Sequence, residues 1–226
     1  LPTSCAADAA LVERCKQELK AYWDKRLDRQ PFDVPEPLVM DATRNLLIQN
    51  LVLRWRYSLG SAVYHNSFYQ PESSDACSLL AKYGYAAEAR DGLESLVEMT
   101  KGPGNYTNWE MGEKLSHAAE YYHLTGDAEF IRANTPAWLK MIAELARQMR
   151  DDPSGLLEPQ RYCGDQTYRS YTVFHQTVCW RGMRDMRIIW QQLGMDEAVA
   201  ACGDADTDLR QALQIALQEN TRVPPD

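Results

Sequence analysis

Two acidic side chains stand beside aromatic residues in polar segments of this sequence. Tyr162 and Tyr168 flank Asp165, and Trp109 directly precedes Glu110. Partial shielding from water raises the pKa of a carboxyl group, which then holds a proton that it can donate. The sequence therefore predicts that Asp165 or Glu110 is an acid in a binding cleft.

Both carboxyl groups also have a structural interpretation. An aspartate in a loop often hydrogen-bonds the neighbouring backbone, which would explain Asp165. A glutamate in the first turn of a helix interacts favourably with the helix dipole, which would explain Glu110. The elements around these residues decide how they are placed.

Apolar residues recur at helical spacing over most of the chain, and no segment alternates with the period of a strand. The pattern predicts an all-α protein. The apolar run around residues 46–53 predicts a helix that is buried on most sides. We expect helices at about 6–28, 39–57, 74–82 and 86–97, then from Glu110 to Gly126, from there to Pro153, after Tyr171, and at about 206–220.

A repeated unit is visible in the order of these helices. Three predicted helices stop at Gly84, Gly126 and Gly194, and glycine takes the left-handed conformation at a helix end at little cost. A second helix follows each stop, and a long polar loop precedes each first helix. The unit is therefore a loop, an inner helix, a glycine turn and an outer helix, with all loops expected at one end.

Four segments of this repeat resemble the six-hairpin glycosidases, the family of (α/α)6-toroid hydrolases that includes glucoamylase and trehalase. Residues 64–84, 105–127, 155–165 and 180–194 are similar, in that order, to loop and inner-helix segments of the family. The resemblance covers roughly residues 38–220. It implies an α/α toroid of antiparallel helix hairpins, of which this chain holds about four of six.

The resemblance also implies an activity. It suggests a glycoside hydrolase, inverting by the habit of the family, with Asp165 as general acid and Glu110 as a second cleft carboxylate. The catalytic base is then expected outside these 226 residues. The residues expected to contact the carbohydrate substrate are Glu72, Trp109, Tyr69, His65, Asn66, Tyr162 and Tyr168.

Two domains are predicted. Residues 1–37 form an N-terminal helix and a proline-rich linker, and residues 38–226 form a partial toroid of the catalytic type. Two other functions remain open. A helical-repeat binding or scaffold module would need no chemistry. A polysaccharide lyase or sugar isomerase on an α/α barrel would use His65, His175 or Tyr168 as its base.

Charge and composition exclude other classes of function. The net charge is −8 and there is no basic run, so nucleic acid is a poor partner. No apolar run approaches 18 residues, so no membrane partner is expected. The six cysteines and four histidines show no metal-ligand spacing, and we expect no metal, no cofactor and free thiols.

Overall fold

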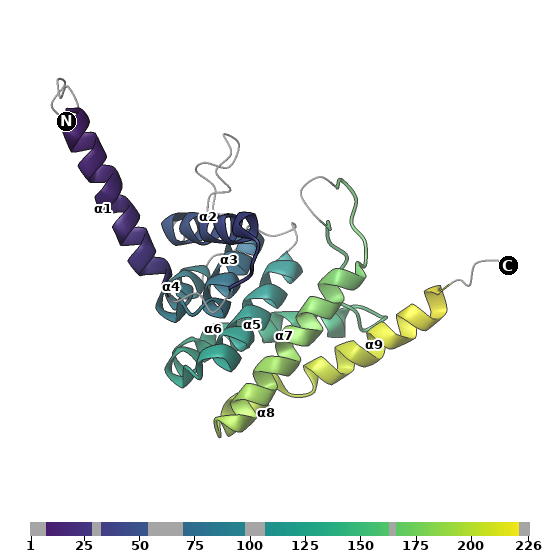
Figure 1. The fold of residues 1–226 in the computed structure, drawn as a ribbon. Helices are drawn as coiled ribbons and strands as arrows, with labels where there is room; N and C mark the ends of the chain where they lie inside the picture. Colours follow the sequence, from purple (N-terminus) through teal and green to yellow (C-terminus); the bar gives the residue numbers. More distant parts are fainter. Residues whose placement is uncertain (1–7, 29–32, 54–69, 98–106, 163–165, 222–226) are drawn as a thin grey trace, which may run out of the picture. The chain divides into compact units, whose positions relative to one another are not determined.

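The computed structural model describes residues 8–28, 33–53, 70–97, 107–162 and 166–221, without the side chains of residues 53 and 70–73. This described part is built of helices joined by turns and loops, and it contains no strand (Figure 1). The all-α prediction is confirmed. The chain divides into two compact units, Leu1–Leu53 and Arg54–Asp226.

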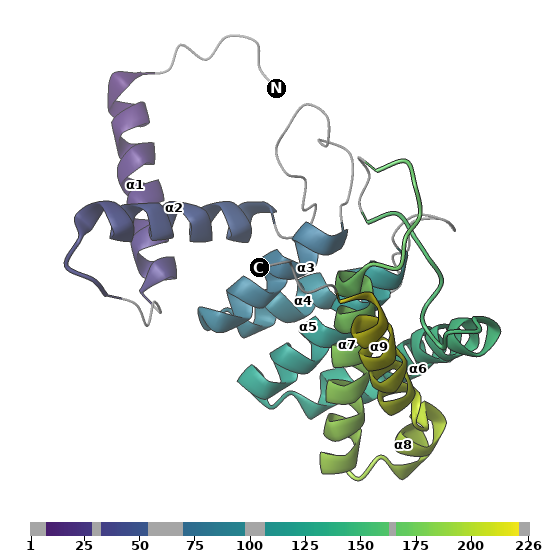
Figure 2. The same cartoon turned by 90° about the vertical axis from the view of Figure 1, so that its right-hand side faces the viewer.

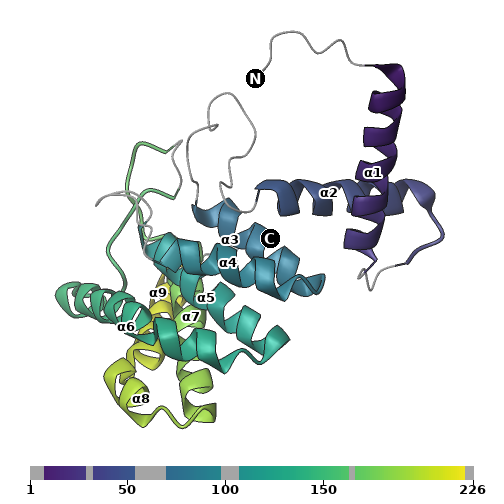
Figure 3. The ribbon, with the colours of Figure 1, turned by 90° about the vertical axis from the view of Figure 1, so that its left-hand side faces the viewer.

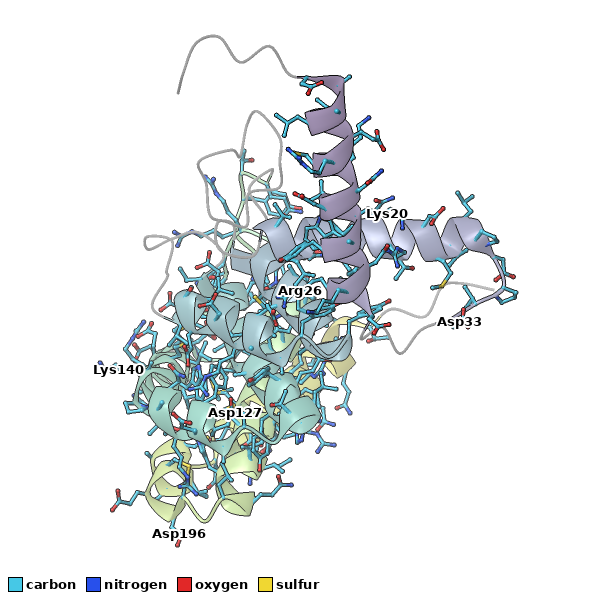
Figure 4. The ribbon with its side chains drawn as sticks, turned by 60° about the vertical axis from the view of Figure 1, so that its left-hand side comes forward. Lys20, Arg26, Asp33, Asp127, Lys140 and Asp196 are labelled. Carbon is cyan, nitrogen blue, oxygen red and sulfur yellow. The ribbon has the colours of Figure 1, made fainter. Side chains whose placement is uncertain are left out.

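The first unit contains α1 (Ala9–Leu27) and α2 (Pro37–Leu53). Asp8 caps α1 by accepting a hydrogen bond from the backbone N–H of Ala10 at 3.1 Å. Arg44 of α2 donates to Asp24 of α1 at 2.6 Å, and Lys20, which Figure 4 labels, pairs with the same carboxylate. The compact unit thus includes α2, whereas the sequence placed the domain boundary before it.

The expectation that α2 is buried on most sides was wrong. Leu47 and Leu51 are buried, but Leu46 is 55% exposed and Val52 is 54% exposed. A single neighbouring helix covers only one side of another helix, so an all-round apolar sequence leaves exposed apolar side chains in this unit.

The second unit consists of two layers of helices, visible in Figures 1, 2 and 3. In the first layer, α5 packs between α3 and α7; in the second, α6 contacts α4, α8 and α9. The members of the first layer are α3 (Gln70–Lys82), α5 (Thr107–Thr125) and α7 (Val173–Gln192). Those of the second layer are α4 (Ala86–Val97), α6 (Ala128–Asp151), α8 (Asp196–Cys202) and α9 (Ala205–Asn220).

The three helices of the first layer run in the same direction. Ser78 lies further along α3 than Ser74, and its partner Glu120 lies correspondingly further along α5 than Glu113, the partner of Ser74. The start of α7 likewise faces the start of α5, since Cys179 donates its thiol hydrogen to the Asn108 carbonyl at 2.9 Å. Their amino-terminal ends therefore share one end of the layer. An α/α toroid repeats such hairpins, and the toroid itself stays a prediction.

The glycine turns adopt the predicted conformation. Gly84, Gly126 and Gly194 have φ values of 81°, 70° and 63°. The turns at Gly84 and Gly194 close in the same way, because the N–H of the residue after the glycine bonds back to the carbonyl of Leu80 in one and of Trp190 in the other. A further positive φ at Gly203 divides the last outer segment into α8 and α9, a break that was not predicted.

Two glycines allow α5 and α7 to approach very closely. A Cβ atom on Gly182 would lie 2.7 Å from the Cβ of Leu115 and 2.8 Å from the carbonyl oxygen of Gly112. A Cβ atom on Gly112 would lie 2.8 Å from the backbone nitrogen of Cys179. These separations are too short for any side chain, so backbone meets backbone where the two helices cross.

Asp127 joins the end of α5 to the start of α6 (Figure 4). Its carboxylate accepts hydrogen bonds from the Phe130 N–H at 3.0 Å, the Tyr121 hydroxyl at 3.0 Å and Arg90 at 3.1 Å. Burial by itself would raise the pKa of Asp127, but these three hydrogen bonds outweigh it and lower the pKa. The carboxylate is therefore a cap for α6 and a tie to α4.

We expect Asp127→Ala to lower the free energy of unfolding by about 1–2 kcal/mol, the usual loss for a helix cap. Because the folded pKa is below the unfolded value, this contribution is present above about pH 4 and is lost as the pH falls. Urea unfolding at pH 7 and pH 3 measures both effects. Asp196→Asn, at the exposed start of α8, is the matched control. An equal loss at both pH values would contradict the role of the carboxylate.

Candidate functional site

Buried amide side chains fix the polar segment that leads to Asp165. Asn108, at the start of α5, exchanges two hydrogen bonds with Gln148 of α6, at 2.9 and 3.0 Å. Its backbone N–H donates to the side chain of Gln160 at 2.9 Å, and Gln160 donates in turn to the Thr107 hydroxyl. Gln148 also accepts from the Glu158 N–H at 3.2 Å. The segment is thereby attached to both layers.

A second clamp holds the same segment to α7. Gln176 accepts from the Leu157 N–H at 3.0 Å and donates to the Leu157 carbonyl at 3.1 Å. Gln160 and Ser170 form an antiparallel bridge between the two arms of the segment. Tyr162 and Tyr168 lie beyond this bridge along the chain, and Tyr162 contacts Trp109 at the start of α5 and His175 at the start of α7. None of these glutamine roles was predicted, because their partners are distant in sequence.

An aromatic cluster lies at this end of the layer. Trp109 of α5 stacks with Tyr162 at 6.4 Å between ring centroids and with His175 of α7 at 6.1 Å. Phe174 meets the Trp109 ring edge-on at 5.5 Å. The four residues Trp109, Tyr162, Phe174 and His175 are called the aromatic platform below. Tyr162 and Phe174 each remain 41% exposed, so the platform is open to a ligand.

His175 has a structural role in this platform. Its ring is buried, and its Nε2 lies 3.2 Å from the carbonyl oxygen of Tyr162. Burial lowers the pKa of His175, and the nearby carbonyl opposes that shift. A neutral imidazole with its N–H on Nε2 suits this contact, and it anchors Tyr162 against α7.

A polar cavity of about 370 Å³ adjoins the platform between α3, α5 and α7. Small-molecule sites commonly have volumes of about 300–1,000 Å³. Phe174 belongs to both features, and Glu113 lines the cavity while it accepts a hydrogen bond from the Trp109 indole. The other residues that line the cavity are Asp75, Ser78, Leu79, Lys82, Ser116, His117, Glu120, Val178 and Arg181.

Three polar residues on one stripe of α5 form much of the cavity wall. Glu113, His117 and Glu120 follow the spacing i, i+4, i+7, which places them on one face of the helix. Glu120 accepts from the hydroxyl of Ser78 and pairs with Lys82 at 2.9 Å. This spacing is the signal in the sequence that could have identified the cavity. The prediction for this helix used only its apolar stripe.

The predicted site residues are only partly brought together. Trp109 and Tyr162 meet in the platform. Tyr168 is 63% exposed and does not join it. Glu72 lies in α3, but its side chain is not among those described. The remaining predictions, Asp165, His65, Asn66 and Tyr69, fall outside the described residues.

Glu110 lies in the first turn of α5 and is 1% exposed. Its charge acts on Lys114 one turn further along, where burial lowers the lysine pKa to about 8 and Glu110 opposes that shift. Lys114 reaches the Val97 carbonyl of α4, so this charged pair lies between the layers. The α5 carboxylates that line the cavity are Glu113 and Glu120, and the catalytic role of Glu110 stays a prediction.

The described ranges contain no group of three histidine, cysteine, aspartate or glutamate side chains placed to hold a metal ion. Nor is any helix within those ranges both long and apolar enough to cross a membrane. Among the described cysteines, Cys15, Cys77, Cys179 and Cys202 have free thiols.

We compared the chain with protein-family models, with curated proteins and with solved structures. No protein-family model matches the chain, and no match was found among curated proteins or solved structures.

Proposed function

We propose that this chain carries the carbohydrate cleft of a glycoside hydrolase. The observation that supports the proposal is the contact between the aromatic platform and the cavity lined by carboxylates. A pyranose has an apolar ring face and a rim of hydroxyl groups. Flat aromatic rings suit the face, and carboxylate oxygens accept hydrogen bonds from the hydroxyls.

The segment that carries Asp165 is held at the same end of the layer. Tyr162, three residues before Asp165, is stacked on Trp109 and bonded to His175. The amide clamps attach the first arm of the segment at Leu157, Glu158 and Gln160, and the bridge to Gln160 ties Ser170 of the second arm. A group that must meet a substrate bond requires such positioning. Asp165 is the proposed general acid: its carboxyl proton passes to the glycosidic oxygen as the bond from that oxygen to the anomeric carbon breaks. A water molecule bonds to that carbon and gives its proton to the catalytic base.

The proposed function is tested with the full-length protein and a panel of p-nitrophenyl glycosides and oligosaccharides. Release of nitrophenol or of reducing ends from at least one substrate is expected. If the protein binds sugars without releasing any product, the non-catalytic binding module is the better description. If it neither binds nor cleaves any member of the panel, the carbohydrate assignment is wrong.

Loss of the Tyr162 ring is expected to weaken sugar binding about tenfold, because a stacked aromatic contact contributes about 0.5–1.5 kcal/mol. Saturation-transfer difference NMR measures the affinity of Tyr162→Ala for the best sugar in the panel. Tyr171→Ala is the matched control, since it removes an exposed tyrosine of the same segment whose hydroxyl donates to Asp152 outside the platform. Equal affinities of Tyr162→Ala and the unaltered protein would contradict the role of the platform.

A further inference from the structure

His117 lies within the polar cavity, in the middle of α5. Its Nε2 is 3.4 Å from the Oδ1 of Asp75 on α3. Its Nδ1 is buried, and no group among the described residues hydrogen-bonds to it. A buried imidazole nitrogen without a partner is costly. His117 is also one of the residues that line the cavity.

The surroundings of His117 determine which nitrogen carries the proton. The nearest group to Nε2 is the Asp75 carboxylate, which can only accept, so the N–H belongs on Nε2 and the lone pair on Nδ1. Burial lowers the pKa of His117, while Asp75 and Glu120 oppose this shift and Lys82 and Arg181 add to it. The neutral imidazole therefore carries its acceptor lone pair on Nδ1 at neutral pH.

The other groups of the cavity indicate what donates to that acceptor. The charged groups that line it are Asp75 and Lys82 from α3, Glu113 and Glu120 from α5, and Arg181 from α7. Lys82 already pairs with Glu120, and Arg181 lies 3.5 Å from Asp185. Leu79, Val178 and Phe174 supply apolar wall. A ligand with hydroxyl donors and an apolar ring face matches this combination better than a compact cation does.

We propose that the Nδ1 of His117 accepts a hydrogen bond from a hydroxyl group of the bound sugar, with Asp75 holding the imidazole in the required tautomer. This proposal rests on the carbohydrate-binding function proposed above. It makes His117 a specificity-determining residue that recognises one hydroxyl position, and it places a sugar ring in the cavity beside the platform.

Two near-isosteric variants distinguish the role of Nδ1 from that of Nε2. In His117→Asn the amide oxygen can occupy the place of Nδ1, whereas in His117→Gln the amide reaches the place of Nε2 and leaves Nδ1 without a substitute. The probes are D-glucose, D-galactose and D-mannose, each followed by saturation-transfer difference NMR. We expect His117→Gln to lose about tenfold in affinity for the sugar that binds best, and His117→Asn to stay within about twofold of the unaltered protein.

The pH dependence of binding tests the same proposal through the protonation of the imidazole. Protonation converts Nδ1 from an acceptor to a donor, so affinity is expected to fall about tenfold between pH 7.5 and pH 4.5 in the unaltered protein and to stay nearly level in His117→Asn. An equal fall in His117→Asn would assign the titration to another group and overturn the proposal.

The outcomes distinguish this proposal from the function on which it rests. Sugar binding that His117→Gln leaves unchanged overturns the His117 subsite and preserves the carbohydrate cleft. Absence of binding by the unaltered protein to all three hexoses and to the glycoside panel overturns both. Near-ultraviolet circular dichroism of each variant shows whether the fold is retained. If His117→Gln fails to fold, the pH series of the unaltered protein and of His117→Asn decides between the outcomes.

Discussion

Asp165→Asn is expected to lower kcat for natural glycosides by about 10³-fold in the full-length protein while leaving sugar binding and folding intact. General acid catalysis typically contributes about 10²–10⁴-fold to a rate. Asparagine keeps the size and polarity of the side chain but has no acidic proton for the leaving oxygen. The measurement is the rate of reducing-end release under saturating substrate.

A substrate with a better leaving group distinguishes an acid from a structural aspartate. 2,4-Dinitrophenolate is a leaving group that departs without protonation. Asp165→Asn should therefore cleave a 2,4-dinitrophenyl glycoside at a rate close to that of the unaltered protein. Asp196→Asn, which makes the same substitution at an exposed helix start, is the control and should leave both rates unchanged. Full activity of Asp165→Asn on natural glycosides would sink the assignment.

Gly182→Ala is expected to lower the free energy of unfolding by about 3 kcal/mol. At an unconstrained helix position the same change would stabilise the protein by about 1 kcal/mol, because alanine has the higher helix propensity. Here the added methyl group would meet the Leu115 Cβ at 2.7 Å and the Gly112 carbonyl oxygen at 2.8 Å. Overpacking of this kind forces the backbones of α5 and α7 apart.

Urea unfolding measures this effect, and Gly126→Ala is its control. Gly126 has nothing within 4 Å of its would-be Cβ but has a positive φ, so its substitution should cost only the left-handed strain of about 1 kcal/mol. Sugar binding should weaken in Gly182→Ala alone, because Trp109 lies on α5 and its partners Phe174 and His175 lie on α7. A Gly182→Ala protein as stable as the unaltered one would contradict the close crossing.

Several elements of the fold follow from local sequence. The helical spacing predicts α4 at residues 86–97 and α9 to within a residue of its start, and the glycine turns at Gly84, Gly126 and Gly194 follow from the conformations that glycine permits. The site is less accessible to such reasoning. Trp109 and Tyr162 were both predicted and do meet, but Glu113 and His117 were not singled out for the cavity.

By itself, the sequence determined the all-α class, the repeated pairing of helices around glycine turns, and an aromatic and acidic character at the loops. These properties depend on residues within a few positions of one another, where helix periodicity and backbone sterics act. The tertiary structure decided the rest. Only the parallel packing of α3, α5 and α7 shows that Gly112 and Gly182 meet, that Gln160 and Gln176 clamp one segment, and that Asp75 faces His117. Those relations join residues tens of positions apart, and they depend on how helices cross, which no local pattern encodes.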